Sequence, residues 1–141
     1  MDRLYQAHLN FYFRTNGSDE VGNTYSYGLR MNYESNNSYT TAEQNEGRMK
    51  LVENGGRMSG EGHRLDLLIH MNNVNDTAQA ADLGNFCMWH CQRIDQSGNW
   101  RGGQGTGWYD SGVHPNGFKM QMSTGQITDY NYALYGLLAW Q

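Results

Sequence analysis

The 141-residue sequence has one proline, two cysteines and no surplus of positive charge, and each shortage excludes a class of protein. Ten Lys and Arg residues against 14 Asp and Glu residues give a net charge of −4, so no basic excess is available for nucleic-acid phosphates. No apolar run approaches the ~20 residues of a membrane-spanning helix. The first residues also lack the apolar stretch of a signal peptide. We therefore expect no nucleic-acid partner, no membrane association, and synthesis in a cytoplasm.

The two cysteines, Cys87 and Cys91, lie four residues apart in the stretch NFCMWHC. In an extended strand this separation spans about 13 Å, whereas a disulfide requires Cα atoms within about 7 Å. The sequence therefore predicts two buried free thiols. A metal site at Cys87, His90 and Cys91 is the disfavoured alternative, because His90 falls on the opposite face of the strand and no second ligand cluster exists. We expect no metal and no cofactor.

Glycine and aromatic residues are abundant: the chain has 18 glycines, ten tyrosines, four tryptophans and four phenylalanines. The aromatic side chains supply the buried area that disordered chains lack. Alternation with period two predicts strands at 4–14, 25–33, 86–94 and 118–122, and short apolar pieces lie near 49–52 and 65–71. We interpret 34–47 and 95–117 as polar connections. About seven strands without an amphipathic helix indicate one all-β domain over residues 1–141, an antiparallel two-sheet β-sandwich or jelly roll with long polar loops.

The stretch GQITDYNYALYGLLAW, residues 125–140, is dense in tyrosine and leucine and carries a single charge, Asp129. Read as a strand, it is apolar on both faces, which is typical of an interior strand or of one that meets a partner chain. The sequence leaves both interpretations open. The candidate core or interface residues are Tyr132, Leu134, Tyr135 and Leu137.

A second candidate contact region is the glycine-rich stretch NWRGGQGTGWYD, residues 99–110. As an exposed loop it offers aromatic rings that stack on a sugar, with Asn99, Arg101, Gln104 and Asp110 as partners for hydroxyl groups. In a second interpretation the aromatic residues are structural: Trp108 and Tyr109 begin a strand and fill the core, and only Trp100 is exposed. A third possibility is packing against a neighbouring subunit. The candidate partner- or sugar-contact residues are Trp100, Arg101, Trp108 and Tyr109.

Catalytic patterns are weak in this sequence. Carboxylates that could act in pairs across a cleft are scattered over predicted turns and polar faces, and they are Glu53, Glu61, Asp66, Asp95 and Asp110. No nucleophile elbow, zinc-binding HExxH or phosphate-binding loop is present. We therefore expect a protein that is not an enzyme.

The succession GFKMQMSTGQITDYNYALYGL, residues 117–137, resembles the C-terminal signature of a β-sandwich module found in virion proteins of tailed bacteriophages. The matching residues are Phe118, Met120, Ser123, Gly125, Ile127, Leu134, Tyr135 and Gly136. Residues 4–33 are similar to the opening strand pair of the module, and residues 62–76 to its central strand and following turn. The resemblance implies a β-sandwich with a terminal LYG strand and a structural role in capsid decoration, tail or fibre-tip proteins.

The extent of the chain separates these viral roles. Because it enters its first predicted strand within a few residues and ends just past the last one, we expect a bare module that attaches by its own surface. This favours a capsid decoration (cement) protein on the virion surface, bound to the major capsid protein and to copies of itself as a homotrimer. The alternative is a tail or fibre receptor-binding protein whose partner is a host surface glycan.

Overall fold

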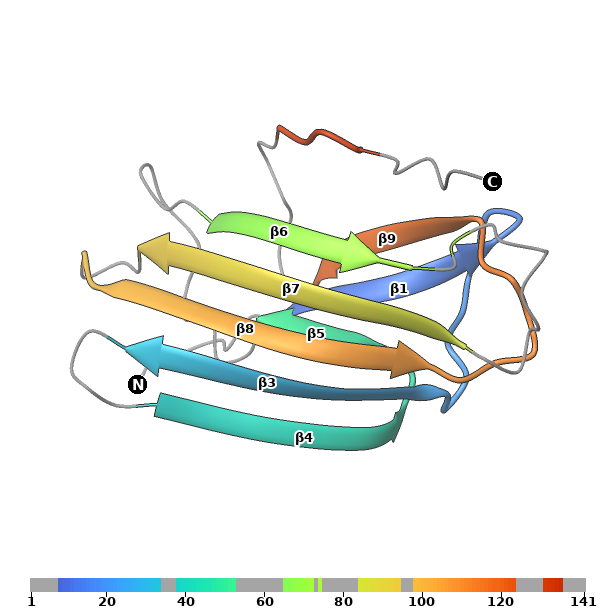
Figure 1. The fold of residues 1–141 in the computed structure, drawn as a ribbon, viewed down its shortest axis with the longest axis horizontal. Helices are drawn as coiled ribbons and strands as arrows, with labels where there is room; N and C mark the ends of the chain where they lie inside the picture. Colours follow the sequence, from blue (N-terminus) through green and yellow to red (C-terminus); the bar gives the residue numbers. More distant parts are fainter. Residues whose placement is uncertain are drawn as a thin grey trace, which may run out of the picture.

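The computed structural model describes residues 8–33, 38–52, 65–72, 74, 84–94, 98–123 and 131–135. Within these ranges the chain forms strands and no helix. The strands are β1 (Leu9–Thr15), β2 (Ser18–Asp19), β3 (Tyr25–Tyr33), β4 (Ser38–Glu46), β5 (Met49–Val52), β6 (Leu65–Met71), β7 (Asn85–Ile94), β8 (Trp100–Tyr109) and β9 (Gly117–Met122). They build two antiparallel sheets packed against each other, which confirms the predicted all-β sandwich (Figure 1).

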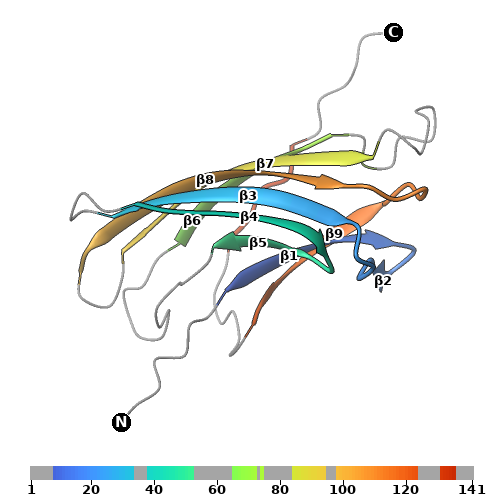
Figure 2. The same ribbon diagram turned by 90° about the horizontal axis from the view of Figure 1, so that it is seen from below.

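The larger sheet has five strands in the order β4-β3-β8-β7-β6, so that β8 is its central strand. In the smaller sheet, β9 pairs along most of β1, while β5 and β2 pair with the two ends of β1. The larger sheet arches over the smaller one (Figure 2). One face of the five-stranded sheet is therefore in the core, and the other is open to solvent.

The core is filled by the inward-facing residues of both sheets. Trp89 of β7 is fully buried, and its indole Nε1–H donates a hydrogen bond to the carbonyl oxygen of Leu51 on the opposite sheet, at 2.9 Å. Tyr25 is also buried; its hydroxyl accepts a hydrogen bond from the amide of Phe13 and donates one to the carbonyl of Glu20. Buried polar groups are stable only when paired in this way. These bonds fix the two sheets against each other.

The predicted strands at 25–33, 86–94 and 118–122 are confirmed, and the alternation at 4–14 is confirmed from Leu9 onward. The short apolar pieces near 49–52 and 65–71 form strands β5 and β6. Two predicted connections are wrong. Residues 38–46 of the first form edge strand β4, whose inward side chains are only half-buried, because an edge strand covers little of the core. Residues 100–109 of the second form the central strand β8, and no long loop separates Trp100 from Tyr109.

The predicted C-terminal core strand is also wrong where the structure describes it. Residues 131–135 form no strand and lie outside both sheets, beyond β6 (Figure 1). Tyr132, Leu134 and Tyr135 are 76%, 68% and 87% exposed. The physical reason is that β1, β5 and β9 already cover the inner face of the five-stranded sheet. Leu137 lies outside the described residues. The interpretation of this segment as a contact with a partner chain stays a prediction.

Candidate binding face on the five-stranded sheet

Strand β8 distributes the predicted contact residues over two faces of the sheet. Because side chains alternate along a strand, Trp100 and Trp108 lie on the outer face, whereas Arg101 and Tyr109 lie on the inner one. Tyr109 is buried, with its ring centroid 4.8 Å from that of Tyr25. The Arg101 guanidinium carbon lies 4.8 Å from the Tyr33 ring centroid. The four residues therefore do not form one contact loop, and the prediction of such a loop is wrong.

Trp100 and Trp108 lie at opposite ends of β8, eight residues or about 26 Å apart. The tryptophans therefore belong to two separate regions of the outer face. The alternative in which Trp108 and Tyr109 fill the core is correct for Tyr109 and for the exposure of Trp100. It is wrong for Trp108, which is 37% exposed. Of the residues proposed to bind hydroxyl groups, Gln104 shares the outer face of β8 with Trp100, and Arg101 lies on the inner face. Asn99 and Asp110 lie just outside the two ends of the strand.

The first region of the outer face is an apolar strip at the Trp108 end. Its four members lie on the adjacent strands β6, β7 and β8: Leu68, Phe86, Met88 and Trp108, which are 57%, 48%, 52% and 37% exposed. Phe86 lies directly opposite Trp108, and the two rings stack with centroids 6.3 Å apart. Met88 is the next outward residue of β7, and Leu68 lies diagonally across from it. The strip thus joins large apolar side chains that face solvent.

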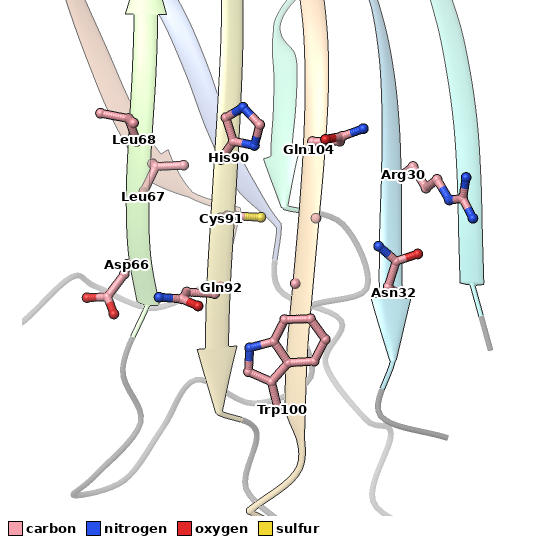
Figure 3. Close-up of a pocket in the computed structure, with 12 residues that line it drawn as sticks. Arg30, Asn32, Asp66, Leu67, Leu68, His90, Cys91, Gln92, Trp100 and Gln104 are labelled. Atoms are coloured by element: carbon pink, nitrogen blue, oxygen red, sulfur yellow. The ribbon is translucent and has the colours of Figure 1, made fainter. Parts of the chain in front are cut away.

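The second region is a polar hollow of about 530 Å³ near the Trp100 end (Figure 3). The strand register explains it. One row across the sheet carries Leu68, His90, Gln104 and Arg30, and the next row carries Asp66, Gln92, Gly102 and Asn32. Because Gly102 has no side chain, the second row has a gap in the middle of the sheet. Polar side chains from β3, β6, β7 and β8 surround that gap.

The indole of Trp100 occupies part of this gap. A Cβ atom built on Gly102 would lie 2.4 Å from Cζ2 and 2.7 Å from Cη2 of that ring, closer than carbon atoms approach without a clash. Trp100 and Gly102 are two residues apart and so share one face of β8. The glycine therefore lets the ring lie down against the strand, while 43% of the residue remains exposed.

The thiols lie on the other face of the sheet. Cys87 and Cys91 are free and buried on the inner face of β7, and His90 points outward between them, as predicted. Burial raises the pKa of the Cys87 thiol to about 12, and burial likewise raises the pKa of Cys91. Both therefore stay protonated at neutral pH, and neither has the lowered pKa of a reactive cysteine.

The candidate carboxylates do not converge within the described part of the chain. Asp66 borders the polar hollow on β6, and Asp110 is exposed past the end of β8. Glu53, Glu61 and Asp95 lie outside the described residues. Among the residues that the structure describes, no cluster of three His, Cys, Asp or Glu side chains could hold a metal ion. The same residues contain no helix that could span a membrane.

Sequence reasoning missed most of the outer face. The apolar strip has a signal in the sequence: residues 86–89 are apolar on both faces, with Phe86 and Met88 on one side and Cys87 and Trp89 on the other. That pattern is typical of a strand that meets a partner. Arg30, Asn32 and Gln92 have no such local signal, because only the strand order brings them beside Trp100.

No protein-family model, curated protein or solved structure matches this chain. The features of this chain that bear on its function are therefore the fold, the apolar strip, the polar hollow and the sequence of residues 117–137.

Proposed function

We propose that this protein is a non-enzymatic structural protein of a tailed-bacteriophage virion that binds the outer surface of the major capsid protein shell as a decoration (cement) protein. The observation that carries the proposal is the apolar strip, in which Phe86, Met88 and Trp108 are exposed side by side on a regular sheet. Contiguous exposed apolar patches of this kind mark interaction sites. The choice of a capsid as partner rests on the resemblance of residues 117–137 to the bacteriophage module.

A rigid sheet face suits the cementing task. The strip lies on paired strands, so its side chains lose little backbone freedom when a partner covers them. Polar residues surround it, including His70, Thr106 and His90, which are exposed on the same face. An apolar centre with a polar rim is the usual anatomy of an interface between preformed proteins. Bridging two coat subunits by such a face adds buried area at the seam, where internal DNA pressure pulls the shell apart.

Contacts between copies of this chain are the second part of the proposal. Tyr132, Leu134 and Tyr135 present large side chains outside the sandwich, where a second copy could cover them. Closed symmetric association is the common form of such self-contact, and a homotrimer fits a three-fold position of a capsid. The virion surface is then the location of the protein.

The test is binding of the purified protein to capsid shells that lack it. We expect Met88→Asp to abolish binding, because it places a charge in the middle of the apolar strip. Thr40→Asp is the matched control, since Thr40 is exposed on the outer face of the same sheet but on the far strand β4. Equal binding of both variants would show that the apolar strip is not part of the interface. Shells that never bind the unmodified protein would contradict the decoration role itself.

The polar hollow favours a second candidate function, a tail or fibre protein that binds a host surface glycan. Trp100 and its polar neighbours carry this alternative, and the apolar strip plays no part in it. Particles without the protein discriminate between the two functions. For a decoration protein they adsorb to host cells but lose DNA early on heating, whereas for a receptor-binding protein they withstand heat normally but do not adsorb.

A further inference from the structure

We infer that the polar hollow on the outer face of β3, β6, β7 and β8 binds one neutral pyranose ring of a glycan, with Trp100 as the stacking surface. The hollow and the apolar strip share only Leu68. The inference therefore holds or fails independently of capsid docking, since a glycan can be bound in solution or on a particle.

The indole of Trp100 provides an apolar plane beside the polar groups. It lies against Gly102, and Ile94 of β7 is directly opposite it in the strand register. One face of a pyranose carries C–H groups, whose slightly positive hydrogens pack on the electron-rich face of an aromatic ring. Because the indole already packs against the strand, it loses little conformational entropy when a ligand binds. Gly102 thus preorganises the stacking surface.

Amide side chains supply the groups that recognise hydroxyls. Asn32, Gln92 and Gln104 come from three neighbouring strands, β3, β7 and β8, and all three line the hollow (Figure 3). Each amide offers both a donor and an acceptor. A sugar hydroxyl also donates and accepts, so that adjacent hydroxyls are satisfied by amides held at neighbouring positions. A few polar groups beside an apolar plane are typical of small-ligand sites.

The charges around the hollow favour a neutral ligand. Arg30 lies on the β3 side and Asp66 on the β6 side, so one positive and one negative group border it from opposite edges (Figure 3). An anionic sugar gains from the guanidinium but is repelled by the carboxylate. A nucleic acid is disfavoured because the chain has a net charge of −4. A neutral hexose is repelled by neither group.

The dimensions fit one sugar ring within a longer chain. The four lining strands span three inter-strand spacings, about 14 Å in all. The volume of about 530 Å³ falls within the range of small-ligand sites. Because the hollow is open to solvent along the sheet, neighbouring sugars of a polysaccharide can extend beyond it.

The experiment is saturation-transfer NMR on the full chain with three probes, the methyl α-pyranosides of D-glucose, D-galactose and D-mannose. Sorbitol is the matched control for hydroxyl groups without a pyranose face, and adenosine is the control for stacking of a nucleobase. We expect transfer to the C–H protons of at least one pyranoside, and none to sorbitol or adenosine. Transfer to no pyranoside would overturn the inference, as would stronger transfer to adenosine.

Two tryptophan variants locate the binding. Trp100→Ala is expected to weaken pyranoside binding at least tenfold, and Gln104→Ala about fivefold. Trp108→Ala removes an exposed tryptophan from the same face of the same strand, about 26 Å away, and should leave binding within twofold of the unmodified protein. Unchanged far-UV circular dichroism shows that each variant is folded. Pyranoside binding that survives Trp100→Ala, or that is lost in Trp108→Ala, contradicts the assignment.

Discussion

Glycine makes room for different partners on the two faces of β8. On the inner face, Gly103, Gly105 and Gly107 each accommodate a large side chain from another strand; these are Met31, Trp89 and Met49, respectively. On the outer face, Gly102 accommodates Trp100 of β8 itself. The inner gaps are filled by the core and therefore determine stability. The outer gap is filled by an exposed ring and therefore shapes a surface.

The strand register explains why the inner gaps occur where they do. Gly107, Gly105 and Gly103 lie directly opposite Cys87, Trp89 and Cys91 of β7. The bulkiest of these, Trp89, needs the space above the neighbouring strand, because protein interiors are packed as densely as organic crystals. An inward side chain on β8 at the same level would overlap the indole. The contrast predicts that equal changes on the two faces will have unequal effects.

The largest difference between the faces is expected in thiol chemistry. Because burial raises the pKa of Cys87 to about 12 from its usual 9.0, its thiolate population at pH 8 is about 1,000-fold lower than that of an unperturbed thiol. We therefore expect Ellman's reagent to label Cys87 in the native protein at least 100-fold more slowly than in the urea-unfolded chain, measured by mass spectrometry of the labelled peptides. Met88→Cys places a thiol on the outer face of the same strand and should label rapidly. Fast labelling of Cys87 or Cys91 in the native protein would show that the inner face opens readily.

The same burial gives the sign of the pH dependence. Above about pH 9 the unfolded chain loses thiol protons that the folded chain keeps, so the free energy of unfolding falls as the pH rises toward 12. Tyr109, whose pKa burial raises to about 12, acts in the same direction.

Gly105→Ala tests the inner face directly. Its Cβ would lie 2.2 Å from Cζ2 of Trp89 and 2.7 Å from the backbone oxygen of Gly28, and neither the buried indole nor the backbone can move away easily. We expect a loss of about 3 kcal/mol in the free energy of unfolding, measured by urea denaturation. Gly28→Ala is the control, because a Cβ there meets nothing nearer than 3.8 Å. A loss below about 1 kcal/mol for Gly105→Ala would argue against this packing of Trp89.

Gly107→Ala is expected to cost less, about 1 kcal/mol. The nearest atoms to the added Cβ all belong to the side chain of Met49, with Sδ at 2.2 Å. Methionine is unbranched and adapts to irregular gaps, so its thioether can rotate away where the Trp89 indole cannot. Equal losses for Gly105→Ala and Gly107→Ala in the same urea titration would mean that the core cannot adjust around Met49.

The sequence predicted the strands whose inward residues are large. Alternation located β3, β7 and β9 because side chains such as Tyr25 and Trp89 mark the buried face. Alternation did not identify β8, because three of its inward residues are glycines and the glycine-rich segment was interpreted as a loop. It also failed at residues 131–135, since apolar side chains alone do not reveal whether a neighbouring strand is available to pair with them.

The candidate site was predictable only in part. Trp100 and Gln104 belong to one stretch of sequence, and both were named as possible sugar contacts. Arg30, Asn32 and Gln92 lie up to 74 positions away in the sequence, and only the strand order β3-β8-β7-β6 brings them beside Trp100 and Gln104. Period-two patterns identify the face on which a residue lies, but they do not identify the strand beside it.

The smallest effect on stability is expected outside both sheets, at Leu134→Ala. Replacing a core leucine costs about 2–5 kcal/mol, but Leu134 is 68% exposed and lies in no strand. We therefore expect a change within about 0.5 kcal/mol in the free energy of unfolding of the monomer, measured by urea denaturation at low protein concentration. Leu29→Ala, on the inner face of β3, is the control for a core leucine. If residues 131–135 join copies of the chain, Leu134→Ala should instead weaken self-association in sedimentation velocity. If Leu134→Ala lowers the free energy of unfolding of the monomer as much as Leu29→Ala does, residues 131–135 belong to the core.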